Sequence, residues 1–119
     1  MAFTQTDKDL ARTCLQDSIK ALDAHPLRNT EKPNLKENFD MAILHREDLI
    51  ERIDDLFDKK VMTKFEMDLM EVSIRNSIEI MTATLMELED AASSATAREI
   101  KVRLQLISTI KTNIRYPRQ

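Results

Sequence analysis

The sequence contains no glycine, and aromatic residues make up only 4% of it. Glycine supplies the positive φ angles of tight β-hairpin turns and lets the backbone approach a phosphate group closely. Its complete absence therefore argues against a sheet joined by short turns and against the glycine-rich nucleotide loops. The residues that dominate instead, such as Leu, Ile, Met, Glu and Lys, favour helices. The composition predicts an all-α fold.

Cysteine and long apolar runs are equally scarce. A single cysteine, Cys14, excludes an intramolecular disulfide framework. No apolar run approaches the roughly 20 residues that span a bilayer, and the first residues lack the pattern of a secretory signal. We therefore expect a cytoplasmic protein, bacterial or in a host cell, with no membrane insertion. The length of 119 residues predicts one helical domain, 1–119.

Apolar residues recur three and four positions apart in four segments of the chain. This spacing predicts four amphipathic helices, of which the second and third are long. Short polar connections between such helices favour an antiparallel four-helix bundle. No internal repeat is evident from the pattern. The expected helices span about 5–24, 34–60, 64–90 and 97–115.

Capping signals refine these boundaries. Thr63 and Glu66 form a capping box at the start of the third helix. The first helix begins near Thr4 or Thr6, and Thr6 with Asp9 forms a weaker box. Thr96 and Glu99 form a further box, which places a break before the fourth helix. Without a glycine near that point, the third and fourth helices could instead continue as one bent helix; we favour the break.

Side chains suited to catalysis or metal binding are few. A di-iron helical bundle needs a glutamate three residues before a histidine, and neither His25 nor His45 has one. Cys14 lies on the apolar stripe of the first helix without a basic neighbour, so we expect a buried hydrophobic side chain and not a nucleophile. The sequence predicts no enzyme activity, no metal and no cofactor.

Positive charge gathers at the C-terminal end. Segment 97–119 has six basic residues and one acidic residue, whereas 61–96 has seven acidic and two basic. A basic helix indicates a possible nucleic-acid surface. We favour pairing with the acidic third helix, because a chain of net charge −3 repels phosphates elsewhere. The residues of this alternative basic patch are Arg98, Lys101, Arg103, Lys111 and Arg115.

The third helix has apolar residues on two opposite faces, and the fourth helix extends the second of them. A surface helix of a bundle needs only one apolar face, and soluble monomers rarely expose large apolar patches. The second face is therefore internal core, a two-fold homodimer interface or a groove for a partner's helix. We favour the homodimer. The predicted interface comprises Phe65, Leu69, Val72, Ile80, Ala83, Val102 and Leu106.

Arg46 interrupts the apolar stripe of the second helix between Ile43 and Ile50. We expect it to extend to the helix edge or to pair with an acidic residue of a neighbouring helix, although a buried contact with a partner is the alternative.

These features together predict a non-enzymatic protein that binds a protein partner through apolar helix faces. An adaptor, a chaperone-like sequestering factor and an inhibitor all fit this description. The alternative is a nucleic-acid-binding regulator that uses the basic C-terminal helix.

Overall fold

The computed structural model describes residues 3–29, 31–85 and 90–115. Two antiparallel helical hairpins make up the fold. The first pairs α1 (Gln5–Asp23) with α2 (Pro33–Lys59) through the short 3-10 helix η1 (Pro26–Asn29). The second pairs α3 (Lys64–Leu85) with α4 (Asp90–Asn113). The predicted all-α fold of four antiparallel helices is confirmed.

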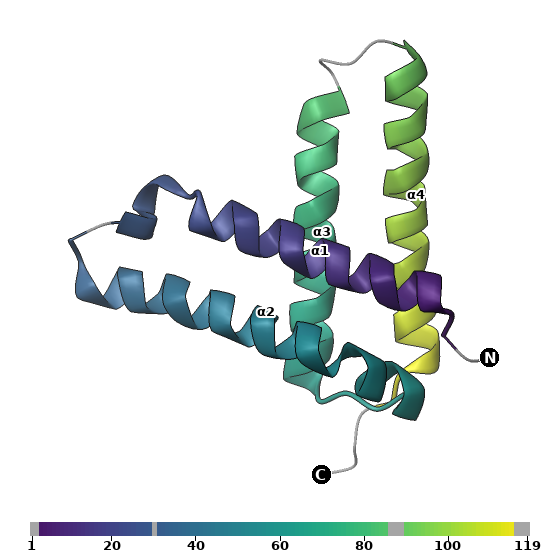
Figure 1. The fold of residues 1–119 in the computed structure, drawn as a ribbon, viewed down its shortest axis with the longest axis horizontal. Helices are drawn as coiled ribbons and strands as arrows, with labels where there is room; N and C mark the ends of the chain where they lie inside the picture. The colour runs from purple at the N-terminus through teal and green to yellow at the C-terminus, as the bar shows by residue number, and fades with distance from the viewer. Residues whose placement is uncertain (1–2, 30, 86–89, 116–119) are drawn as a thin grey trace.

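The two hairpins cross steeply and form two layers, with α1 and α2 on one side of α3 and α4 (Figure 1). The molecule measures 44 × 40 × 19 Å. Since one helix with its side chains is about 10–12 Å across, the shortest dimension corresponds to two helices. Each hairpin therefore has one face against the other hairpin and one outer face without a covering layer.

The helix boundaries agree with the sequence except around residue 90. Thr4, and not Thr6, caps α1, because its hydroxyl accepts from the Asp7 amide while the Asp7 carboxylate accepts from the Thr4 amide. The fourth helix begins at Asp90, so the predicted start at 97 and the box at Thr96 are wrong. Residues 90–97 contain no proline or glycine, and nothing in them prevents helix formation.

The third and fourth helices are separate, as favoured. Because residue 90 already belongs to α4, the expected end of the third helix at 90 is too late; residues 86–89 lie outside the described part of the chain. The capping box at the start of α3 is confirmed. The Glu66 amide donates to Thr63 Oγ1 over 3.1 Å, and the Thr63 amide donates to Glu66 Oε1 over 2.9 Å.

The core lies where the hairpins cross and draws on all four helices. Phe3, just before α1, packs its ring against Phe57 near the end of α2, with centroids 4.5 Å apart. Met62 occupies the matching place before α3 and is 1% exposed. The other buried apolar residues are Ala11, Cys14, Leu15, Leu49, Ile53, Leu56, Met67, Met70, Ile74, Leu106, Ile107, Ile110 and Ile114.

An internal repeat relates the two hairpins, so the expectation of no repeat is wrong. A shift of 59 residues places α1 on α3, and a shift of 57 places α2 on α4. The matching residues are mostly buried or capping residues, whose side chains the fold constrains most. Identical pairs include Thr4 and Thr63, Leu10 and Leu69, Ser18 and Ser77, Arg46 and Arg103, Leu49 and Leu106, and Ile53 and Ile110.

Hydrogen bonds follow the same repeat. In the first hairpin, Arg46 Nε donates to Ser18 Oγ over 2.8 Å. In the second, Arg103 Nε donates to Ser77 Oγ over 3.0 Å. Each arginine also donates through Nη1 to the carbonyl oxygen four residues earlier on its own helix. An arginine of the outer helix thus binds a serine of the inner helix in both halves.

The contact between hairpins is itself symmetric under the repeat. Asn76 Nδ2 donates to Ser18 Oγ over 2.9 Å, and Ser77 Oγ donates to Asp17 Oδ2 over 2.8 Å. Since Asn76 and Ser77 are the counterparts of Asp17 and Ser18, each contact is the counterpart of the other. Such reciprocal pairing is the signature of an approximate two-fold axis, here between α1 and α3.

Candidate interaction surface

The residues predicted to form an interface do not share one surface. Phe65, Val72, Ile80 and Val102 are 56%, 47%, 43% and 43% exposed, and Ala83 is exposed. Leu69 is half-buried and packs against the core.

Leu106 is 3% exposed and belongs to the core, so its assignment to the back of the fourth helix is wrong. Arg103 takes a buried position on α4 through its bond to Ser77. This arrangement turns Leu106 inward and leaves Leu104 47% exposed.

Helix α1 covers only one edge of the second apolar face of α3. It crosses at Asn76 and Ser77, whose side chains bond to Ser18 and Asp17. Phe65 and Val72 therefore lie on one side of the crossing, and Ile80 lies on the other. Part of this face is therefore internal contact, and part of it is exposed.

Phe65 borders a groove between α2 and the start of α3. Its ring meets His45 edge to face, with centroids 5.1 Å apart and planes at 75°. Beneath them, the buried Glu66 forms an ion pair with Arg52 of α2. The groove encloses about 300 Å³ and is lined by His45, Asp48, Leu49, Arg52, Thr63, Phe65, Glu66 and Leu69.

The alternative basic patch is interrupted. Arg103 is 3% exposed and bonds to Ser77 and to Glu99 of its own helix. Lys111 pairs with Glu71 of α3 over 2.8 Å, which confirms the expected pairing with the acidic helix at this position. The exposed cations left from the predicted patch are Arg98, Lys101 and Arg115.

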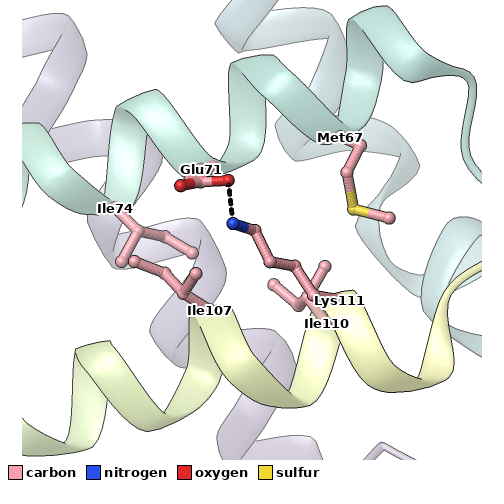
Figure 2. Close-up of a pocket in the computed structure, with 6 residues that line it drawn as sticks. All are labelled: Met67, Glu71, Ile74, Ile107, Ile110 and Lys111. Carbon is pink, nitrogen blue, oxygen red and sulfur yellow. Dashed lines mark ion pairs between the residues drawn. The ribbon is translucent and has the colours of Figure 1, made fainter.

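The Glu71–Lys111 pair closes the side of the α3–α4 hairpin. Figure 2 shows the two side chains meeting beside Ile74 and Ile107, with the paler α1 behind the two helices. Hydrogen bonds from Lys111 and Arg75 hold the pKa of Glu71 below its ordinary value of 4.5. The cavity at this point has a volume of about 10 Å³, room for one water molecule at most.

Buried polar groups at the crossing serve the packing of the hairpins. Arg46 is 6% exposed and bonds to Ser18, so the expected acidic partner is wrong; burial lowers the pKa of its guanidinium. Cys14 is buried, as expected. Burial raises the pKa of its thiol despite the nearby Arg103, which leaves the thiol protonated at neutral pH.

Residues 3–29, 31–85 and 90–115 contain no cluster of three or more His, Cys, Asp or Glu side chains arranged to hold a metal ion. No helix within these ranges is long and apolar enough to cross a bilayer. His25 Nδ1 accepts from the Leu27 amide over 3.1 Å.

The internal repeat identifies exposed apolar residues that the fold does not require. Positions 65, 72 and 80 of the second hairpin correspond to Thr6, Thr13 and Ala21 of the first. The first hairpin thus carries a polar or small residue wherever α3 exposes an apolar one.

The same comparison applies to α4. Val102 and Leu104 correspond to His45 and Glu47, both exposed. The shift of 57 residues is the signal in the sequence that marks position 104 as one that a polar residue can occupy. The reverse also occurs, with apolar residues in the first hairpin and charged ones in the second: α2 exposes Met41 and Leu44 where α4 has Arg98 and Lys101.

No family model, curated protein or solved structure matches this chain.

Proposed function

We propose that this chain is a non-enzymatic, cytoplasmic protein that binds a protein partner through exposed apolar side chains of its second hairpin. An adaptor, a sequestering factor and an inhibitor are the forms of this function that the surface suits. The observation that carries the proposal is the difference between the hairpins. Phe65, Val72 and Leu104 are about half exposed, while their counterparts in the first hairpin are Thr6, Thr13 and Glu47.

Phe65, Val72 and Leu104 lie outside the hydrophobic core, although the Phe65 ring contacts the exposed His45. The counterparts show that polar side chains are compatible with the same helices in the same arrangement. Fully burying an aliphatic or aromatic side chain contributes roughly 1.5–3 kcal/mol, which binding a partner would recover in part.

The test exchanges the apolar residues for those of the first hairpin. The variant Phe65→Thr/Val72→Thr/Leu104→Glu should fold as the wild type does, with the same helical content and unfolding midpoint. Immobilised wild-type protein in an extract of the source cells should retain a protein, identified by mass spectrometry, that the triple variant does not retain. Thr13→Asp, on the outer face of the first hairpin, is the matched control and should retain it.

Two outcomes contradict the proposal. The first is that the wild type and the triple variant retain the same proteins. The second is that the wild type retains nucleic acid with a steep salt dependence and loses it on Arg98→Glu/Lys101→Glu substitution. That result would assign the function to the basic C-terminal helix instead.

A further inference from the structure

The outer face of α3 carries a regular row of exposed side chains. Its buried residues, from Glu66 to Ser77, lie on one side of the helix. At 100° per residue the opposite side holds positions three and four apart, and all of them are exposed. In Figure 1 the α1–α2 hairpin lies on one side of α3, which leaves the reverse side uncovered. The row consists of Lys64, Asp68, Val72, Arg75 and Glu79.

The order of charges in this row is complementary to its own reverse. From one end it reads positive, negative, apolar, positive and negative. Placed antiparallel to a second copy, Lys64 faces Glu79 and Asp68 faces Arg75, each twice. The centre of this alignment falls next to Val72, which is 47% exposed and would face its own copy. Every charge in the row meets an opposite charge.

These charges are mostly available for such contacts. In the described part of the chain, Lys64, Asp68 and Glu79 form no ion pair, and Arg75 pairs with Glu71 on its own helix. Leu104 extends the apolar part of the face onto α4. It lies two turns before Lys111, on the same side of the helix, and Lys111 reaches Glu71 at the edge of the row.

The first hairpin lacks this pattern. The counterparts of the row are Gln5, Asp9, Thr13, Gln16 and Lys20. Reversed on itself, that row sets Gln5 against Lys20 and Asp9 against Gln16, with no pair of opposite charges. The self-complementary order is therefore a property of the second hairpin and not of the repeat.

We propose that the outer face of the α3–α4 hairpin binds the same face of a second copy, with the two α3 helices antiparallel about a two-fold axis at Val72. This inference rests on the proposed function and names its partner. A two-fold contact uses the same patch on both copies, so the patch must be complementary to itself. This row meets that requirement, because each of its charges faces an opposite charge when a second copy is placed antiparallel to it. Val72 and Leu104 supply the apolar contact, while the charges fix the register more than the affinity.

Charge reversal followed by mixing tests the arrangement in the full chain. Asp68→Lys alone places the new lysine against Arg75 twice per dimer, and Arg75→Glu alone places the new glutamate against Asp68 twice. Sedimentation equilibrium of the wild type at micromolar concentrations should show a dimer. Each variant should raise the dimer dissociation constant at least about tenfold. An equimolar mixture of the two variants should recover dimers, because the new lysine of one copy then meets the new glutamate of the other, and the remaining Arg75 meets the remaining Asp68.

Matched controls come from the first hairpin. Asp9→Lys and Gln16→Glu change the corresponding positions and should leave the dissociation constant unchanged. Far-ultraviolet circular dichroism of each variant should match the wild type, which excludes unfolding as the cause of dissociation.

The proposal is overturned if the wild type is a monomer at hundreds of micromolar, if the single variants stay dimeric, or if the mixture stays monomeric. A monomeric wild type whose extract partner is lost on Phe65→Thr/Val72→Thr/Leu104→Glu substitution would retain the proposed function and exclude the second copy as the partner. The two proposals therefore fail separately.

Discussion

Replacing Ser18 with alanine should destabilise the fold more than replacing the arginine that binds it. The Ser18 hydroxyl is fully buried and accepts from Arg46 Nε over 2.8 Å and from Asn76 Nδ2 over 2.9 Å. Within the described residues, Arg46 forms no ion pair with a carboxylate. Ser18→Ala therefore removes one of the acceptors that stabilise a buried positive charge.

The magnitude follows from these two bonds. A hydrogen bond to a charged group contributes about 1.5–3 kcal/mol, and a neutral one about 0.5–1.5 kcal/mol. Because Asn76 is only half-buried, water can replace part of its bond, and we expect a loss of roughly 2–4 kcal/mol. With a urea dependence of about 1–3 kcal/mol per molar, the unfolding midpoint should fall by roughly 1–2 M.

Arg46→Met removes the buried charge instead of its partner. Methionine fills much of the same space, and Ser18 keeps its bond to Asn76. Replacing a buried charge with an apolar side chain is often neutral or stabilising, so we expect a change within about 1 kcal/mol. Urea titrations followed by circular dichroism measure both variants and the double variant, in which the penalty for Ser18→Ala should shrink. The reasoning fails if Arg46→Met is as destabilising as Ser18→Ala.

Three further predictions concern the ion pair, the caps and the turn at Lys60. Glu71→Gln should make the free energy of unfolding depend less on pH in acid. The folded-state pKa of Glu71 lies below 4.5, so the stability that its carboxylate contributes is complete above that pH and is lost as the pH falls through the folded-state pKa. Urea titrations between neutral and acid pH check this, and an unchanged dependence would contradict it. Thr63→Ala should lower the free energy of unfolding by about 1 kcal/mol, which is more than the loss expected for Thr4→Ala. The reason is that the amide left without its cap is part-buried at α3 and exposed at α1. The opposite order of the two urea midpoints would refute this. Lys60→Gly should raise the free energy of unfolding by roughly 0.5–1 kcal/mol, since Lys60 has a φ of 57° that glycine adopts without strain. A lowered urea midpoint would show that the turn carries no strain.

The sequence predicts the helices well because their signals are local. Apolar spacing and Pro33 in the first turn define α2, and the box of Thr63 and Glu66 defines the start of α3. Two capping positions were open for α1 because Thr4–Asp7 and Thr6–Asp9 are similar in sequence. Packing decides between them: Phe3 is buried against Phe57, which fixes Thr4 as the first capping position.

The candidate surface was harder to predict, because polarity along a helix does not reveal where another helix crosses it. Asn76 lies among the apolar residues of the second face of α3, and it marks the contact with α1. Arg103 looked like part of a basic patch, yet it is buried on Ser77. Arg46 was noticed because it breaks an apolar stripe. Only the repeat connects the two arginines, and it is weak enough to require the structure for its detection.

The repeat also separates what the fold needs from what it merely tolerates. Several positions that face the crossing keep their residues in both hairpins, as Ser18 and Ser77 do. Most of the exposed positions on the outer face of α3 differ from their counterparts, with Thr13 in one hairpin where Val72 stands in the other. Because both hairpins fold in the same chain, these outer differences do not arise from folding. The outer face of α3–α4 is therefore where a function beyond folding should be sought.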